Sequence, residues 1–156
     1  MTPKYILNVA FAATAVLVAS TPAPIQAQGK AASAKSLRCT FSLMATATWN
    51  KDGAPEAAVK PSKLVLRFDS INTDEGTAQL RNGTVGTGLT VQLSNGNLHF
   101  TQSFRTGPLY LTTVFDKETS AGKLKAVHSR HEYFTVPLEG ATSSPEQYLG
   151  ECEVVN

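Results

Sequence analysis

The chain has 156 residues, of which 42% are hydrophobic and 17% charged, and its formal net charge is +2. The basic residues are scattered singly, so the basic patch that nucleic-acid or anionic-membrane binding needs is missing. The two cysteines form no Cys-x-x-Cys pair, and no catalytic or metal motif stands out. We therefore expect no cofactor, no metal and no enzymatic activity.

The first 27 residues have the three segments of a secretory signal peptide. A basic start at Lys4 precedes an apolar run from Tyr5 to Ala19, and a cleavage region with small residues ends at Ala27. The apolar run is too short to span a membrane. We predict cleavage after Ala27 or Gly29 and a periplasmic or secreted product that keeps no membrane contact once the signal is removed.

The chain beyond the signal peptide is long enough for one domain with its own core. Residues 28–36 are small, polar or basic, and predict a flexible leader, whereas residues 37–156 predict the domain. Cys39 and Cys152 lie near opposite ends of that domain, in a compartment that export makes oxidising. We predict a disulfide between them, which could stabilise the fold by roughly 4 to 5 kcal/mol through chain entropy.

Segments with a period of two predict β-strands from residue 37 onward. In the first segment the apolar residues at odd positions, from Leu37 to Trp49, alternate with residues that are polar except for Met44. Breaks rich in Gly, Pro, Asn and Asp separate the segments, and Asn95-Gly96 carries the strongest hairpin signal. The predicted strands cover residues 37–50, 64–69, 78–81, 89–93, 98–104, 109–115, 124–133 and 147–154.

Eight short strands without an amphipathic helix predict an all-β fold, either a barrel or a sandwich. In an up-and-down order, Cys39 near the start of the first strand and Cys152 near the end of the last lie at the same end. Pairing of these two strands would bring the sulfurs together and remove exposed edges. We therefore favour an antiparallel up-and-down eight-stranded β-barrel of lipocalin- or avidin-like architecture, with a β-sandwich as the alternative.

The opposite end of such a barrel is the predicted mouth. It carries the two longest loops, residues 50–63 and 134–146, and binding residues tend to sit on loops held by a rigid scaffold. An aromatic wall with cationic donors at this level could hold a small anionic or aromatic ligand, or contact a protein partner. Its predicted residues are Trp49, Arg105, Arg130, His131 and Tyr133. The alternative is that Trp49 plugs the barrel end as core.

The segment from Ala126 to His131 has unusual polar density. His128 and His131 are three residues apart, so on a strand they point to opposite faces and do not share one metal. One register would turn His128 and Arg130 into the barrel, and the other would turn His131 inward, so the choice stays open. A buried His needs hydrogen-bond partners, for which the candidates are Gln102, Thr113 and Glu132. The segment predicts either a satisfied core network or a polar lumen for a ligand.

In strand number, size and terminal disulfide, the chain resembles small exported barrels of the lipocalin and avidin kind and the periplasmic inhibitors of lysozyme. No functional residue is carried over from them. Two functions follow as hypotheses. The first is a binding protein that holds a small, partly apolar or anionic ligand at the barrel mouth. The second is a protein-interaction barrel, such as an enzyme inhibitor, with a filled lumen and a protruding loop at residues 50–63 or 134–146.

Overall fold

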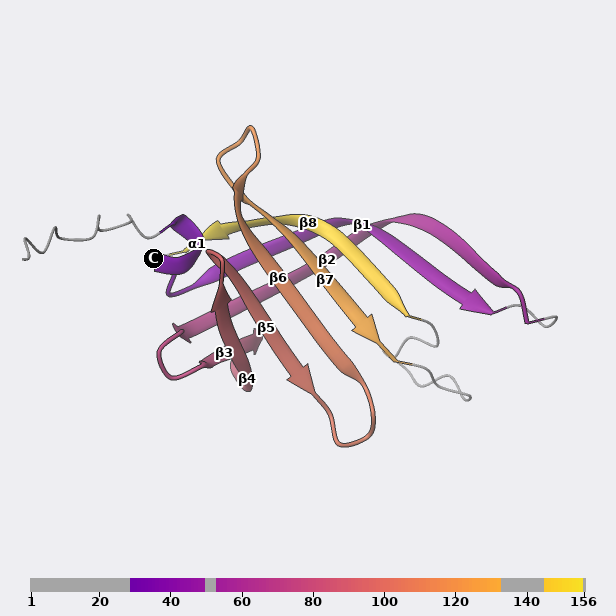
Figure 1. The fold of residues 1–156 in the computed structure, drawn as a ribbon, viewed down its shortest axis with the longest axis horizontal. Coiled ribbons are helices and arrows are strands. Elements are labelled where there is room, and N and C mark those ends of the chain that lie inside the picture. Colours follow the sequence, from indigo (N-terminus) through magenta and orange to yellow (C-terminus); the bar gives the residue numbers. More distant parts are fainter. Residues whose placement is uncertain (1–28, 50–52, 133–144, 156) are drawn as a thin grey trace, which may run out of the picture.

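The computed structural model describes residues 29–49, 53–132 and 145–155, so the predicted signal peptide lies outside the described residues. Within these ranges, a single sheet of eight antiparallel strands closes in a ring, here called the strand ring (Figure 1). Its strands are β1 (Leu37–Trp49), β2 (Pro55–Asn72), β3 (Thr77–Asn82), β4 (Val85–Ser94), β5 (Asn97–Ser103), β6 (Leu109–Glu118), β7 (Leu124–His131) and β8 (Glu146–Val154). The predicted all-β class is confirmed.

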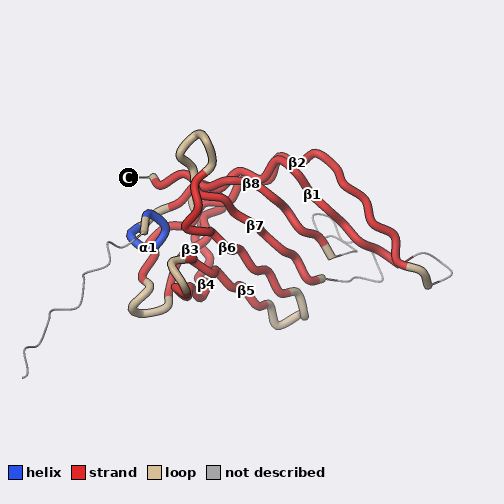
Figure 2. Tube along the Cα trace, turned by 45° about the horizontal axis from the view of Figure 1, so that its top comes forward, coloured by secondary structure: helices blue, strands red, loops and turns tan. Residues whose placement is uncertain are grey.

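Each strand pairs with its neighbours in sequence, and β8 returns to pair with β1 (Figure 2). A single closed sheet excludes the alternative of two separate packed sheets. The predicted hairpin between β4 and β5 is confirmed, because Asn95 and Gly96 both have positive φ and Ser94 pairs with Asn97. Two positive-φ residues in a two-residue turn match the twist of the flanking strands.

The interior of the strand ring is filled by aromatic and aliphatic side chains at one end. Phe41, Phe68 and Phe100 are fully buried, and the rings of Phe68 and Phe100 stack with centroids 4.2 Å apart. Leu37, Leu98 and Leu124 are buried in the same core cluster. Burial of this apolar surface provides the main favourable free energy of folding.

The disulfide between Cys39 and Cys152 is confirmed and lies inside this core. The two residues are direct partners in the ladder that joins β1 to β8, and neither is exposed. The covalent bond therefore joins the first and last strands where the ring closes.

A β-bulge at Ser42 inverts the faces of β1. The register of β1 shifts between Phe41 and Leu43 against both β2 and β8. Against β8 the extra residue is on β1, because Leu43 pairs with Leu149, the neighbour of the Gly150 that pairs with Phe41, whereas against β2 the extra residue is on β2. An extra residue on one strand moves every later side chain to the other face of the sheet. Phe41 is therefore buried, whereas Leu43 is 40% exposed and Met44 packs against the core.

Gly150 on β8 makes this bulge possible. It lies opposite Phe41, and a Cβ at position 150 would be only 2.1 Å from the carbonyl oxygen of Thr40. No side chain fits at such a distance, so the close approach of β8 to β1 requires glycine.

Strand β2 begins earlier than predicted. We expected a loop over residues 50–63, but β2 starts at Pro55 and pairs with β1 from that residue onward. Its pairing with β3 covers only residues 67–72. Among the described strands, this part of β2 has no second neighbour, and Pro55 and Pro61 are tolerated there because such an edge does not require every N–H. The β1–β2 hairpin therefore extends beyond the rest of the ring (Figures 1 and 2).

The segment 28–36, predicted to be a flexible leader, contains a short helix, α1 (Lys30–Ser33). Ala31 and Ala34 are buried and belong to the core cluster. The periodicity of the sequence did not indicate this helix because it has only one turn. It lies beside the start of β1 and the end of β8 (Figure 1), which is the end of the ring where Cys39 pairs with Cys152.

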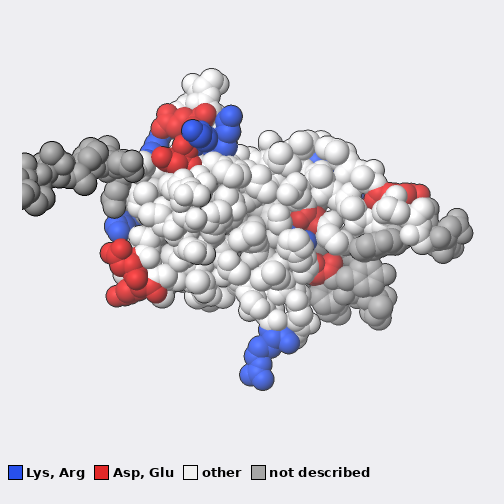
Figure 3. All heavy atoms as spheres, viewed as in Figure 1, with Lys and Arg blue, Asp and Glu red and all other residues white. Residues whose placement is uncertain are grey.

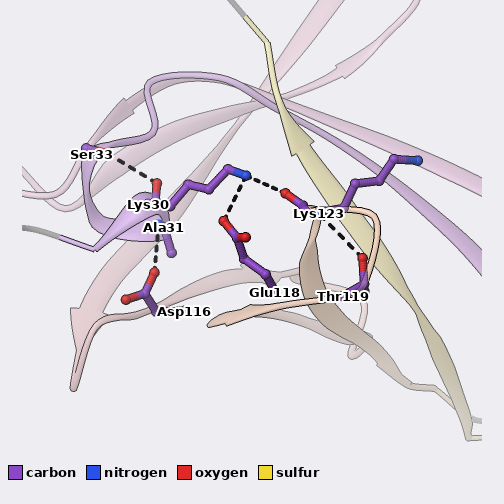
Figure 4. A network of polar contacts seen from close by, with 8 residues as sticks. Lys30, Ala31, Ser33, Asp116, Glu118, Thr119 and Lys123 are labelled. Atoms are coloured by element: carbon purple, nitrogen blue, oxygen red, sulfur yellow. Dashed lines mark hydrogen bonds and ion pairs between the residues drawn. The ribbon is translucent and has the colours of Figure 1, made fainter.

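Polar contacts attach α1 to β6 and to the turn that follows it (Figure 4). The backbone N–H of Ala31 donates to Oδ1 of Asp116 at 3.1 Å. The ammonium group of Lys30 donates to the carboxylate of Glu118 at 3.0 Å and also to the carbonyl oxygen of Gly122. The filled end of the ring is thus closed by a helix with fixed partners.

On the face seen in Figure 3 most charged side chains lie near the outline of the molecule, with a few to the right of the centre, and much of the remaining surface is uncharged. Exposed ion pairs include Lys123 with Glu151 at 2.8 Å and Arg38 with Glu153 at 3.0 Å. Exposed pairs of this kind contribute little to stability. Across the described ranges, no helix has the length and apolar character needed to cross a membrane.

Candidate binding site inside the strand ring

The inward face of β7 carries the polar portion of the interior. Leu124, Ala126 and His128 are buried, so the register left open by the sequence is the one that turns His128 inward. Arg130 follows on the same face, with 20% of its side chain exposed. His131 is on the opposite face and exposed. The structure therefore brings His128 and Arg130 together and separates both from His131.

His128 is held between two partners. Its Nδ1 lies 2.8 Å from the hydroxyl oxygen of Thr112, and its Nε2 lies 3.3 Å from Nε of Arg130. Since Arg130 can only donate, Nε2 accepts, and Nδ1 carries the proton that is donated to Thr112. Burial, with the neighbouring charge of Arg130, lowers the pKa of His128 from 6.5 to about 4. The imidazole is therefore neutral at physiological pH.

The guanidinium group of Arg130 lies between two tyrosine rings. Its central carbon is 5.3 Å from the ring centroid of Tyr110 and 5.2 Å from that of Tyr148. Tyr110 comes from β6 and Tyr148 from β8, the two strands that flank β7. Both contacts are within the range of a cation–π interaction and hold the cation in place.

Each tyrosine in turn donates to a carboxylate. The hydroxyl of Tyr110 donates to Glu132 at 2.8 Å, and the hydroxyl of Tyr148 donates to Glu146. Burial and these carboxylates raise the pKa of both tyrosines to about 12. Glu146 also lies 4.0 Å from the guanidinium of Arg130. The positive charge of Arg130 is therefore compensated within the site.

A cavity of about 310 Å³ adjoins this cluster. Its apolar wall comes from β2 and β3, and its polar wall from β5, β6 and β7. The described lining residues are Leu64, Val65, Leu66, Leu80, Arg81, Gln102, Tyr110, His128 and Arg130. Below it, towards Phe68 and Phe100, only about 10 Å³ of free space remains. The ring interior is thus filled at the disulfide end and hollow near Arg130.

The cavity reaches past the end of β3. Leu64, Leu66 and Leu80 belong to the partly buried side of their strands, whereas Val65 and Arg81 are exposed on the outer side. All of them line the same cavity. Since Arg67 and Arg81 form the last pair between β2 and β3, the cavity opens where β2 continues without β3. A ligand could enter from the side of the ring at this point.

Only some of the site residues predicted from the sequence line the cavity. His128 and Arg130 line the cavity, whereas Arg105 is exposed in the turn between β5 and β6 and His131 is exposed at the end of β7. Tyr133 and the side chain of Trp49 lie outside the described residues. The sequence therefore located two of the residues that meet at the cavity.

The partners of His128 were predicted less well. Thr112, rather than Thr113, is the hydrogen-bond partner, and Thr113 contacts His99 instead at 3.1 Å. Gln102 lines the cavity, and Glu132 accepts from Tyr110. The sequence pattern also missed Tyr110, Tyr148 and Glu146. The strand order could have indicated them, because β6 and β8 are the neighbours of β7 in an up-and-down sheet.

The described residues contain no group of three or more His, Cys, Asp or Glu side chains arranged to hold a metal ion. No protein-family model, curated protein or solved structure matches this chain. Its function is therefore inferred from the chemistry of the ring interior.

Proposed function

We propose that this protein is an exported binding protein, a β-barrel of the lipocalin or avidin kind that holds a small ligand beside Arg130. The observation that carries the proposal is the cavity of about 310 Å³ with one apolar and one polar wall. Sites for small molecules have volumes of about 300 to 1,000 Å³ and combine apolar walls with a few fixed polar groups. The ligand would be small and mostly apolar, with one polar end.

The charges around the cavity favour an uncharged ligand over an anionic one. Arg130 is already flanked by two aromatic rings and lies 4.0 Å from Glu146. An incoming anion would have to compete with this carboxylate and with Glu132, which is buried nearby. The amide of Gln102, which can both donate and accept a hydrogen bond, is the better anchor for a neutral polar group.

The protruding β1–β2 hairpin supports a second candidate, a protein-interaction barrel such as a periplasmic or secreted enzyme inhibitor. This hairpin replaces the loop over residues 50–63 that the sequence suggested for such a role. The hollow region of the ring argues against it, because an interaction barrel has no need of an internal cavity. We therefore rank the binding protein first.

Dye binding tests the proposal on the protein purified after expression of the full chain. We expect saturable fluorescence enhancement of the neutral naphthalene dye prodan, with weaker binding of the anionic dye 1-anilinonaphthalene-8-sulfonate. Leu64→Trp should reduce prodan affinity about tenfold because the indole occupies the cavity. Gln92→Trp, at an exposed position of β4, is the matched control and should bind as the wild type does.

Thermal melts of each variant separate loss of binding from loss of the fold. Native mass spectrometry of the purified protein should also reveal a co-purified small molecule. If neither dye saturates and no bound molecule is found, the binding function is wrong and the interaction barrel becomes the better candidate.

A further inference from the structure

Gln102 on β5 lies at the inner end of the cavity beside Arg130. Its side chain lines both the cavity of about 310 Å³ and the narrow space of about 10 Å³ towards Phe68 and Phe100. Phe100 is buried inside the ring, and residues two apart on a strand share a face. The amide of Gln102 therefore lies at the boundary between the filled and the hollow parts of the interior.

Two other polar side chains of the cavity wall already have protein partners. His128 contacts Thr112 through Nδ1 and Arg130 through Nε2, so both nitrogens of the imidazole are in use. The hydroxyl of Tyr110 donates to Glu132 at 2.8 Å. Neither group is left to determine which polar group a ligand must carry.

The two cations of the cavity wall are also engaged by the protein. Arg81 donates from Nε to Asp69 at 3.0 Å and from a terminal nitrogen to the carbonyl oxygen of Thr84 at 3.5 Å. Arg130 is held between two tyrosine rings and lies 4.0 Å from Glu146. Both guanidinium groups are thus bound to the wall and compensated in charge.

The amide of Gln102 differs from these groups. Within the described residues it has no hydrogen-bond partner, and the leucines that share this cavity wall, Leu66 and Leu80, carry no polar atom in their side chains. A polar group that loses water to an apolar ligand without gaining a new hydrogen bond costs free energy. A ligand that fills the cavity must therefore supply both a donor and an acceptor to this half-buried amide.

We propose that Gln102 determines the specificity of the cavity, and that the ligand is a neutral ring with an N–H beside a C=O, as in a lactam. The Gln amide presents a C=O and an NH₂ side by side in one plane, so such a ligand makes two hydrogen bonds at once. Gln side chains pair in the same bidentate way with the edge of adenine. This inference rests on the proposed binding function and names the ligand class for it.

The opposite wall determines the rest of the ligand. Leu64, Leu66 and Leu80 line the cavity from β2 and β3, whereas Gln102 and Tyr110 line it from β5 and β6. A ring whose polar edge pairs with the amide would place its remaining carbon atoms against these leucines. The lactam is therefore fused to, or substituted with, an apolar group.

Fluorescence titration with two neutral probes tests the proposal on the protein purified after expression of the full chain. The probe 2-quinolone has an N–H beside its C=O, whereas N-methyl-2-quinolone lacks this donor. We expect saturable binding of 2-quinolone with an affinity about tenfold higher than that of the methylated probe. The methylated probe leaves the carbonyl oxygen of Gln102 without a donor.

Gln102→Met separates the hydrogen bonds from the steric effect of the methyl group. The variant keeps an unbranched side chain but removes the amide, so the preference for 2-quinolone should fall to about twofold or less. Gln92→Met, at an exposed position of β4, is the matched control and should keep the preference of the wild type. Far-UV circular dichroism and melting temperatures verify that each variant folds.

Prodan distinguishes failure of this inference from failure of the binding function. If the wild type binds prodan saturably but binds the two quinolones with equal affinity, the lactam class is wrong and the binding function stands. A preference that persists in Gln102→Met would overturn the role of Gln102 in the same way. If neither prodan nor either quinolone saturates, the binding function and this inference both fail.

Discussion

Arg130 donates a hydrogen bond from Nε to Nε2 of His128 at 3.3 Å, a bond that only a neutral imidazole can accept. A protonated imidazole has no acceptor, so it would lose the bond and face the guanidinium charge at close range. Burial of the imidazole, together with the neighbouring charge of Arg130, lowers the pKa of His128 from 6.5 to about 4 and keeps it neutral in the folded protein.

This lowered pKa predicts a loss of stability on acidification. Between pH 6.5 and about 4 the unfolded chain binds a proton at His128 that the folded chain does not, so the free energy of unfolding falls as the pH falls. The contribution is complete above pH 6.5 and is lost over this window, with a total on the order of 3 kcal/mol. Urea denaturation across the window should record it.

His128→Gln removes this titration and serves as the comparison. The difference in unfolding free energy between wild type and variant should shrink as the pH falls. An NMR titration of the His128 ring measures the pKa independently of stability. A pKa near 6.5 in the folded protein would contradict the prediction.

Removal of the disulfide should destabilise the ring at its closure. Cys39 and Cys152 are 113 residues apart, and in the chain-entropy model opening a loop of this size costs about 4 to 5 kcal/mol. We expect Cys39→Ala/Cys152→Ala to lose about 3 to 5 kcal/mol in chemical denaturation. A reducing agent should destabilise the wild type and leave the double variant unchanged. Equal effects on both proteins would argue against the disulfide as the cause.

Gly150→Ala adds only one carbon atom but should strongly lower the free energy of unfolding. The new Cβ would lie 2.1 Å from the carbonyl oxygen of Thr40 and 2.6 Å from Cα of Phe41, so backbone must move. We expect a loss of about 3 kcal/mol or more, measured by thermal and urea denaturation. Gly88→Ala on β4 is the control, because its Cβ would meet nothing within 4 Å, and it should change stability by less than about 1 kcal/mol. Similar losses in both variants would contradict a specific contact at the bulge.

Because β1 changes face at the bulge, two neighbouring substitutions should differ in their loss of stability in the order opposite to that of a regular strand. Met44 packs against the core, whereas Leu43 is 40% exposed. We expect Met44→Ala to cost about 1 to 2 kcal/mol and Leu43→Ala less than about 1 kcal/mol, measured by urea denaturation. An uninterrupted strand with Leu37 and Phe41 inward would give the reverse order. Observation of that reverse order would mean that the bulge does not form.

The candidate site was partly predictable because inward and outward residues alternate on a strand. The pattern of β7 restricted the inward polar residues to two sets, and one of them contained His128 and Arg130. The sequence of β7 alone could not choose between the sets, since apolar residues occur on both phases. The choice depended on the partners from β6 and β8 that stack on Arg130.

The sequence by itself determined the all-β class, the number of strands and the pairing of Cys39 with Cys152, because period-two patterning, turn residues and cysteine count are local or additive properties. Only the tertiary structure decided where β1 changes face, how far β2 extends and which region of the ring stays hollow. The apolar residues at odd positions continue from Leu37 to Trp49 across Ser42, so the sequence pattern does not reveal the bulge there. Its position depends on how closely Gly150 lets β8 approach β1, which is a contact between residues more than a hundred positions apart.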